Sequence, residues 1–416
     1  MNILRRLPTS RLLAVCAAAV LIVAGGTAAA VAVTSSAPKP PAKPLPRAIH
    51  DALAAPAVKG VTATISFTNK LIDDSSVQGG NALLKGATGR LWATKNQLRL
   101  ELQSGSGGGD SQLVVNNRTW WAYDASSNTV YRGTLSAHKA DKARKAGHAK
   151  ADHGVPSVAD ITKKLNEAAK NAVLSGAIPS TVAGQSAYTL RVGPKHDGGL
   201  LGAVEVGWDA VNGVPLRAAV YAQGSNSPVL ELSATDVKFG NVPASDFAIT
   251  PPSNAKVVRV SQPSHAQTAK AKARAKGAKR RSQAAEKVRG PAAVDAAVPF
   301  KLSAPAKLAG LPRQDVRLLD WNGHPAALVS YGQNLGGIAV IERQPDTKNA
   351  KQSQAPKGKR DGEGQTRLPT LSINGATGTE LATALGTVVQ FDRRGVSYVV
   401  IGSVPPQAAE AAARGL

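Results

Sequence analysis

Cysteine is almost absent from this chain of 416 residues, because Cys16 is the only one. A single thiol cannot close an intramolecular disulfide, so packing and hydrogen bonds alone must hold the fold. Cys16 follows Val15, where a lipidation signal needs a small residue, and more apolar residues come after it. We interpret Cys16 as an ordinary residue of an apolar segment.

Aromatic and acidic residues are also scarce. Aromatic residues make up 4% of the chain, so we expect cores of Val, Leu and Ala. Asp and Glu total 27 against 51 Lys and Arg, which gives a net charge of +24. Much of this excess falls between residues 262 and 289, where Glu286 is the single acid. The basic residues there are Lys270, Lys272, Arg274, Lys276, Lys279, Arg280, Arg281, Lys287 and Arg289.

This basic segment has too little apolar surface to fold alone, so we expect a disordered linker. A charge run of this kind could bind an anionic polymer. No aromatic residue for base stacking is interleaved with the charges, which argues against a specific nucleic-acid partner.

Catalytic motifs are missing as well. The chain has no His-Glu-x-x-His, no cysteine pair, no Walker loop and no nucleophile elbow. His138, His148 and His153 lie near one another, but no carboxylate or cysteine accompanies them at ligand spacing. We therefore expect neither an enzyme nor a metal or cofactor site.

The N-terminus carries a targeting signal. Arg5, Arg6 and Arg11 precede an uncharged apolar run over residues 12–33, which is long enough to span a bilayer. Small residues around 28–30 also offer a cleavage site. Either a single-pass signal anchor or a cleaved signal peptide fits, and both place the bulk of the chain outside the cytoplasm.

Composition divides the chain into five parts. Residues 1–35 are the signal segment, 36–47 a proline-rich spacer, and 48–260 a strand-rich domain. The basic linker spans 261–298. A smaller α+β domain spans 299–416, with a polar, disordered insertion at 344–367.

The strand-rich part centres on residues 110–135, where three short β-prone runs are separated by turn residues. Trp120 and Trp121 must point to opposite faces of one strand, because side chains alternate with a period of two. Similar strands are expected at 61–67, 87–94, 97–103, 186–192, 202–210, 216–222 and 229–237. A helix is expected over 157–174, and a double proline at 251–252 should close the domain.

The C-terminal part contains strand patterns at 326–331, 337–343, 368–373, 388–393 and 396–402. Residues 377–385 fit either a short helix or a strand. A terminal helix is expected over 405–414.

An ordered set of short blocks spans residues 50–260, and with it the chain resembles the LolA-like superfamily. That superfamily includes lipoprotein carriers, actinobacterial lipid-transfer lipoproteins and RseB/MucB-type sensors. The C-terminal part resembles a small α+β domain of exported anti-sigma-like proteins. The blocks are Leu113-Val114-Val115, Thr119 to Asp124, Val130-Tyr131-Arg132, Gly184 to Leu190, Trp208 to Arg217, Val229 to Leu232 and Phe247 to Pro252.

The resemblance implies a strongly curved antiparallel half-barrel with covering helices, within an α+β chain. It also implies an apolar cavity that binds lipid or an acylated protein, lined by one of the two tryptophans. The competing interpretation is that the same residues only fill a core. The cavity candidates are Ile65, Phe67, Leu98, Leu100, Trp120, Trp121, Leu190, Trp208, Leu216, Val220 and Leu230.

Two functions follow from the resemblance. The first is a membrane-anchored, extracytoplasmic protein that binds lipid or a lipidated protein. The alternative is an RseB-type regulator that binds a transmembrane anti-sigma factor, which the extra C-terminal domain favours.

Overall fold

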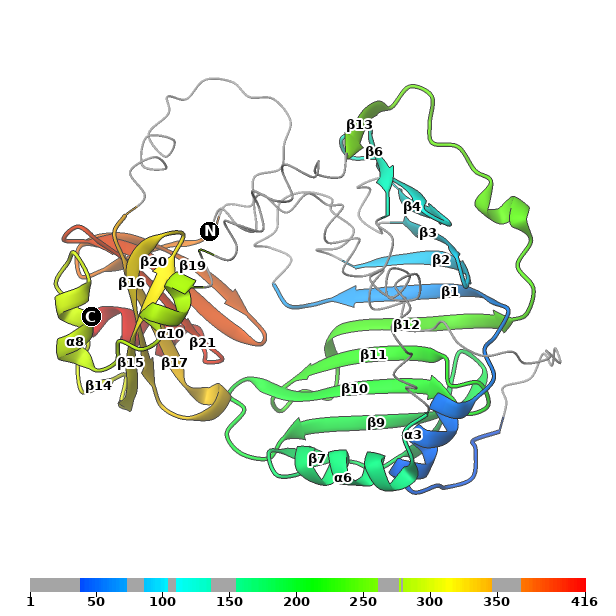
Figure 1. The fold of residues 1–416 in the computed structure, drawn as a ribbon, viewed down its shortest axis with the longest axis horizontal. Helices are drawn as coiled ribbons and strands as arrows, with labels where there is room; N and C mark the ends of the chain where they lie inside the picture. Colours follow the sequence, from blue (N-terminus) through cyan, green and yellow to red (C-terminus); the bar gives the residue numbers. More distant parts are fainter. Residues whose placement is uncertain are drawn as a thin grey trace.

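The computed structural model of the chain describes residues 38–72, 86–103, 110–135, 155–260, 277, 280–345 and 368–416. The protein belongs to the α+β class, because strands dominate, helices are few, and the strands form two sheets (Figure 1). The targeting segment with Cys16, the three histidines His138, His148 and His153, most of the basic linker and nearly all of the polar insertion lie outside the described residues.

The larger sheet has 13 strands and curls into an open half-barrel, as predicted (Figure 1). Its order is β13-β6-β5-β4-β3-β2-β1-β12-β11-β10-β9-β7, and β8 also pairs with β9. The pairing of β13 with β6 is parallel and the others described are antiparallel. The strands are β1 Gly60–Asn69, β2 Ala87–Thr94, β3 Gln97–Gln103, β4 Ser111–Asn116, β5 Thr119–Asp124, β6 Thr129–Thr134, β7 Ala172–Leu174, β8 Ile178–Val182, β9 Gln185–Pro194, β10 Leu201–Asp209, β11 Pro215–Ala222, β12 Pro228–Phe239 and β13 Lys256–Val260.

The curvature is concentrated where the strand register slips. Irregular pairings fall at Thr64/Ile65 between β1 and β12, at Val220/Tyr221 between β11 and β12, and at two points between β10 and β11. Each extra residue bends its strand and increases the local twist. Together they bend the middle of the sheet into a trough.

Two helices pack on the inner face of this trough. The helix α3, Leu45–Ala54, and the helix α6, Val158–Ala168, meet a cluster of β9 and β10 side chains. Ser157 caps α6 by accepting a hydrogen bond from the Asp160 backbone N–H at 3.1 Å. The predicted helix was too long, because residues 172–174 hydrogen-bond to β9 as β7 and cannot stay helical.

The proline-rich segment before α3 is also attached to the sheet. The Tyr188 hydroxyl donates to the Pro41 carbonyl at 2.7 Å, and Lys43 forms a bridge with Ala177. The described part of the predicted spacer, from residue 38 onward, therefore belongs to the folded unit.

The chain after β12 crosses the outer face of the sheet. A short 3₁₀ helix, η3 at Ala244–Phe247, buries Phe247 there, and Arg99 donates to the Asp246 carbonyl at 2.9 Å. The double proline does not end the domain, because β13 follows it and adds to the sheet beside β6. Local sequence could not reveal this pairing, since β6 lies more than a hundred residues earlier.

The second sheet has eight strands in the order β14-β15-β16-β17-β21-β20-β19-β18. Residues 376–383 form a strand, which settles one of the two predicted alternatives. Two helices, α8 Pro291–Ala297 and α10 Pro406–Arg414, pack on this sheet. The strands are β14 Lys307–Leu308, β15 Leu311–Trp321, β16 His324–Tyr331, β17 Ile338–Arg343, β18 Thr370–Ile373, β19 Ala376–Thr383, β20 Gly386–Arg393 and β21 Val396–Gly402; the 3₁₀ turn η4 is Asn334–Gly336.

The C-terminal unit begins earlier than composition indicates. Residues up to 298 were predicted to be disordered linker, but α8 lies within them and its Val294 is fully buried. Val288, Val294 and Val298 reach one core together. The average composition of this segment did not reveal its folded part. A few valines at suitable spacing can anchor a short helix when a sheet covers them.

Backbone hydrogen bonds connect the two sheets in the described part of the chain. The Leu200 backbone N–H donates to the Ser403 carbonyl and hydroxyl, each at 3.0 Å, and the Ala384 N–H donates to the Leu71 carbonyl at 2.8 Å. Within the described residues, no helix combines the length and apolarity needed to cross a bilayer. The predicted anchor lies outside those residues.

Candidate functional site

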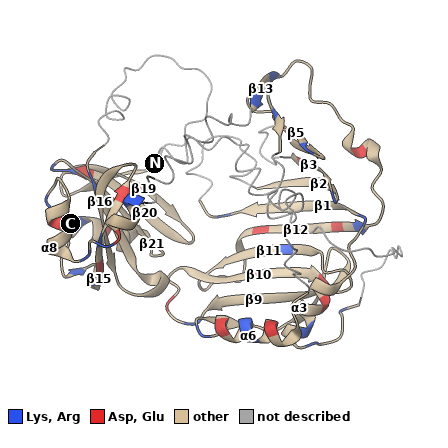
Figure 2. Cartoon of the chain, viewed as in Figure 1, with Lys and Arg blue, Asp and Glu red and all other residues tan. Residues whose placement is uncertain are grey.

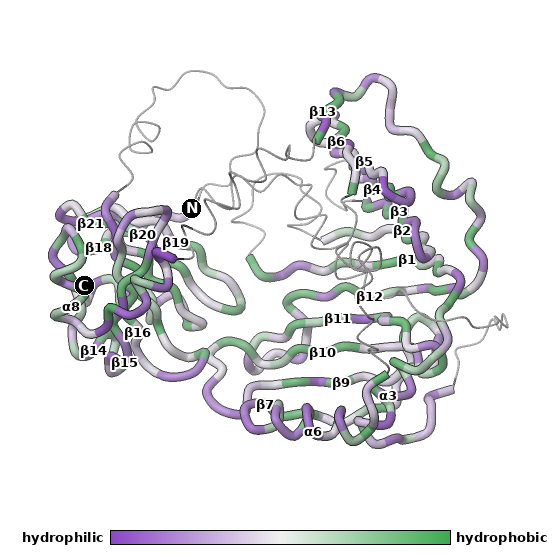
Figure 3. The backbone as a smooth tube through the Cα atoms, in the orientation of Figure 1, coloured by the Kyte–Doolittle hydropathy of each residue, from purple (hydrophilic) through white to green (hydrophobic). Residues whose placement is uncertain are grey.

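The inner face of the half-barrel is defined by side chains from distant strands that meet. Val61, Ala63 and Leu91 of β1 and β2 share one cluster with Leu216 of β11. Side chains from strands so far apart in the order can touch only across the concave side of a curved sheet. Hydrophobic and polar residues alternate along these strands, as Figure 3 shows.

Two rows of apolar side chains lie on this face, and each row crosses five neighbouring strands. Cross-strand partners share a face of a sheet, so each row is read directly from the pairings. The first row is Phe67, Leu232, Ala218, Val206 and Leu190. The second row is Leu230, Val220, Val204, Val192 and Leu174.

These rows form a floor that is only partly covered. Val204 is 39% exposed, Val206 is 40% exposed, and Ala218 is also exposed. Phe67, Leu190 and other members are half-buried. This exposed apolar surface on the concave face is the candidate site for an apolar ligand.

Other predicted cavity residues lie in closed core. Leu98 and Leu100 are 3% and 7% exposed and pack in a cluster of β2 to β5, with Ile65 and Trp120 against it. Leu216 is buried beside β1, and Trp208 is buried under α3 and α6. The floor itself contains four of the predicted residues, Phe67, Leu190, Val220 and Leu230.

Trp120 and Trp121 lie on opposite faces, as their adjacency requires. Trp120 packs against the inner cluster with Leu98 and Leu113. Trp121 lies on the outer face, where it lines a depression with Val114 and Phe247 beneath the η3 segment. Trp121 therefore does not lie on the concave face of the half-barrel, which we call the hollow.

The floor includes six residues that sequence reasoning missed, and three of them are its exposed members: Val204, Val206 and Ala218. The other three are Leu174, Val192 and Leu232. A signal was present, because Val204 and Val206 alternate with Glu205 and precede Trp208 with the same period. Only the pairing of β10 with β9 and β11 shows that they face the hollow.

A charged network on the outer face fixes the strands of the floor. Arg217 donates to Glu205, to Glu231 at 2.6 Å and to the Tyr221 hydroxyl at 3.0 Å. The Arg191 guanidinium lies 4.2 Å from the centre of the Tyr221 ring. Burial lowers the pKa of Arg217, but hydrogen bonds to Glu231 and Tyr221 and both carboxylate charges raise it more, so the net pKa is above its usual value.

The helix α3 is held over the hollow by a small ionic cluster. Asp51 accepts from Lys43 at 2.9 Å and pairs with Arg47 at 2.9 Å. The hydrogen bond from Lys43 is the largest cause that lowers the pKa of Asp51. These contacts and the Tyr188–Pro41 hydrogen bond hold α3 where it packs with Leu174 and Leu190, at one end of the floor.

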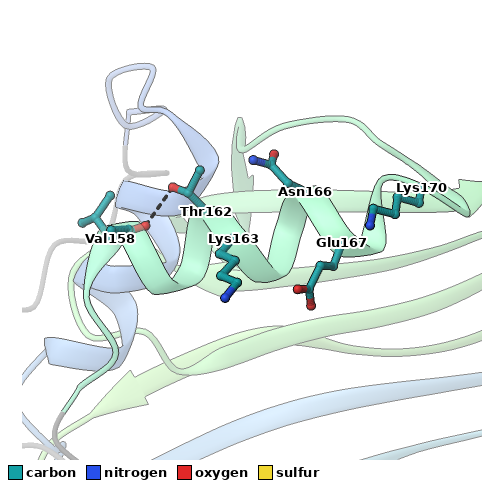
Figure 4. Close-up of a pocket in the computed structure, with 7 residues that line it drawn as sticks. Val158, Thr162, Lys163, Asn166, Glu167 and Lys170 are labelled. Carbon is teal, nitrogen blue, oxygen red and sulfur yellow. Dashed lines mark hydrogen bonds between the residues drawn. The ribbon is translucent and has the colours of Figure 1, made fainter.

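Two surface depressions are found elsewhere. One follows the exposed side of α6 between Val158 and Lys170 (Figure 4), and the other is the one beside Trp121. Charged and polar side chains line the α6 groove, which makes it a poor site for an apolar ligand. No group of three metal-ligating side chains occurs in the described part of the chain.

The comparison with solved structures found MucB and LolA-superfamily proteins, all at low TM-scores. The MucB structure in complex with MucA(peri) is 14% identical over 89% of this chain and 94% of that chain, with a TM-score of 0.34. The Pseudomonas aeruginosa MucA/MucB complex gives 15% identity, 88% and 95% coverage, and a TM-score of 0.35. The LolA superfamily protein NE2245 from Nitrosomonas europaea is 11% identical over 50% of this chain and 99% of that one, with a TM-score of 0.20.

No protein-family profile and no curated protein matches the sequence. The structural similarities concern the fold alone, so the chemistry of the site rests on the residues described above.

Proposed function

We propose that the hollow of the half-barrel binds lipid or the acyl chain of a lipidated protein. One observation carries this proposal: Val204, Val206 and Ala218 stay exposed on the concave face, although their neighbours in both rows are apolar. Burying such a surface under hydrocarbon is favourable by about 25 cal/mol per Å².

The size and chemistry of the floor fit an acyl chain. It crosses five strands, or roughly 19 Å at the usual spacing of 4.8 Å. The acyl chains of one bilayer leaflet extend about 15 Å. The two rows contain no charged residue, so they offer contact area rather than hydrogen bonds. This favours a binding role over a catalytic one.

The test is a titration of the full-length protein with a fluorescent fatty acid. Replacing the two exposed valines in V204Q/V206Q should weaken binding at least about tenfold, because polar amides replace apolar contacts of about 0.8 kcal/mol per CH₂. The matched control is V173Q/V211Q, which alters two exposed valines away from the floor. Equal affinity of the two double variants would refute the proposal.

A second function is favoured by the C-terminal sheet. Carriers that resemble the half-barrel lack this addition, and here it contacts the half-barrel through Leu200 and Ser403. MucB, one of the proteins of similar fold, has been solved with MucA(peri). An RseB-type regulator that binds a transmembrane anti-sigma factor would use both units. Affinity capture from membranes that recovers no membrane protein would count against it.

Both functions require an exported chain. We propose that the targeting segment at residues 12–33 places the described residues outside the cytoplasm, as an anchor or after cleavage. Mass spectrometry of the mature N-terminus distinguishes these two outcomes.

A further inference from the structure

The free end of the half-barrel sheet carries an unusual charge arrangement. Strands β6 and β13 run parallel there, and Arg132 pairs directly with Arg259 across them. Both arginines are exposed. Like charges placed opposite each other destabilise a sheet. In the described part of the chain neither arginine has an acidic partner, and β6 and β13 contain no acid.

Apolar residues flank this arginine pair at the sheet edge: Val257 shares the face of the arginines, whereas Val260 and Leu135 have the alternation of Gly133 and lie on the opposite face. Val257 is 48% exposed, Val260 is 44% exposed and Leu135 is 41% exposed. Arg118 is exposed beside them and donates to the Leu135 carbonyl. We define these six residues, Arg118, Arg132, Leu135, Val257, Arg259 and Val260, as the edge patch. Figure 2 shows basic residues on β13 and on strands close to it.

The register places the arginine pair on the outer face of the sheet. Arg132 is the cross-strand partner of Trp121, which in turn pairs with Val114 beside the η3 segment. The hollow opens on the other face. Arg132, Val257 and Arg259 therefore face away from the floor, and a ligand on the floor does not cover them.

The parallel pairing also sets where the chain leaves the sheet. Gly133 and Val260 are paired, so β6 and β13 end at the same corner. In sequence, each strand is followed by a lysine-rich stretch, residues 139–150 after one and 270–281 after the other. Exposed arginines and exposed apolar residues thus lie on the two faces of the corner after which both basic stretches follow in sequence.

We propose that the edge patch docks on the surface of an anionic membrane. Arginines that face phosphate headgroups, with adjacent valine and leucine side chains at the acyl boundary, match the chemistry of interfacial membrane binding. The anionic surface would relieve the repulsion between Arg132 and Arg259. This role is independent of the ligand proposed for the hollow.

The chain allows a direct test, because Cys16 is its single cysteine. A nitroxide label is attached to V257C in a C16S background of the full-length protein, which is reconstituted into vesicles. One set contains phosphatidylglycerol and phosphatidylcholine in equal parts, and the other contains phosphatidylcholine alone. Power saturation with oxygen and a nickel chelate then reports whether the label contacts lipid or water.

We expect lipid contact in the anionic vesicles and aqueous exposure in the neutral ones. R132Q/R259Q should lower the ratio of lipid-contacting to aqueous label by at least about tenfold, since each arginine near the surface contributes about fivefold. K163Q/K164Q removes the same charge from exposed positions on α6 and should leave the ratio unchanged. A label at V211C, in the loop between β10 and β11, should stay aqueous throughout.

Three results would overturn the proposal. The label at position 257 could stay aqueous in both vesicle types. Its lipid contact could survive R132Q/R259Q. Heparin or DNA could immobilise the label while anionic vesicles do not, which would assign the patch to a soluble polyanion instead.

Discussion

Glu342 is a buried carboxyl group at the centre of the C-terminal sheet. It is fully buried, it accepts from the Ser303 backbone N–H at 2.9 Å, and its Oε1 has no hydrogen-bond partner among the described residues. Burial is the main cause that raises its pKa from 4.5 to about 7, and the charge of Asp295 adds to the rise.

This shift predicts a pH-dependent stability. Because the folded pKa exceeds the unfolded one, protonation stabilises the fold fully below about pH 4.5. That stabilisation is lost as the pH rises to about 7, and the loss approaches roughly 3 kcal/mol. Urea unfolding of the C-terminal sheet at both pH values should show this loss in the wild type. E342Q, which cannot ionise, should remove that part of the dependence, and an unchanged pH profile would contradict the assignment.

Arg217 is the second residue for which we predict a loss of stability on substitution. Its guanidinium neutralises Glu205 and Glu231, which are both largely buried. We expect R217M to destabilise the half-barrel by about 3 kcal/mol, because it leaves two carboxylates unpaired. Denaturant unfolding measures the loss. Adding E205Q and E231Q to R217M should restore much of it, and a failure to do so would show that packing, not charge, dominates.

At the scale of elements, the sequence predicted most strands of the half-barrel, but it did not predict how they pair. Alternating apolar residues located β1 to β6 and β9 to β12, because one face of each must be buried. β15 was missed, since Arg and Asp residues interrupt its apolar pattern and Val316 alone is buried. A cavity was predicted from residues such as Phe67 and Leu190, and strand pairing places both on one face of the sheet. The exposed residues of that face, such as Val206, were not predicted, because strand register cannot be read from the sequence.

The helix α6 offers a prediction of its own. Ser157 is its N-terminal cap, and S157A should lower the free energy of unfolding by about 1 kcal/mol. Thermal unfolding measures the change. S157D keeps a cap and should retain most of the stability; equal losses in both variants would mean that the serine has another role.

At the scale of the whole molecule, the contact between the two sheets is narrow and rests on tight backbone approach. A Cβ at Gly199, where φ is +59°, would lie 2.1 Å from the Ser403 carbonyl oxygen. A Cβ at Gly336 would meet the Asp197 carboxylate. The loop between β9 and β10 thus joins the half-barrel to the second sheet where no larger side chain fits.

We expect G199A to separate the two sheets without unfolding either. Amide exchange at Leu200 should accelerate, and the radius of gyration from small-angle scattering should rise. G224A is the matched control, because Gly224 has a φ of +72° with nothing within 4 Å of its Cβ. Any effect shared by both variants reflects backbone strain, and only the excess in G199A reports the contact.

The central claim is that the exposed floor of the half-barrel is a site for an acyl chain. The most direct measurement is photocrosslinking of the full-length protein with a fatty acid that carries a diazirine along its chain, followed by peptide mapping. We predict adducts within residues 201–222 and 228–232, competed by unlabelled fatty acid and lost in V204Q/V206Q. Adducts confined to the α6 groove, the depression beside Trp121 or the N-terminal apolar segment would contradict the account.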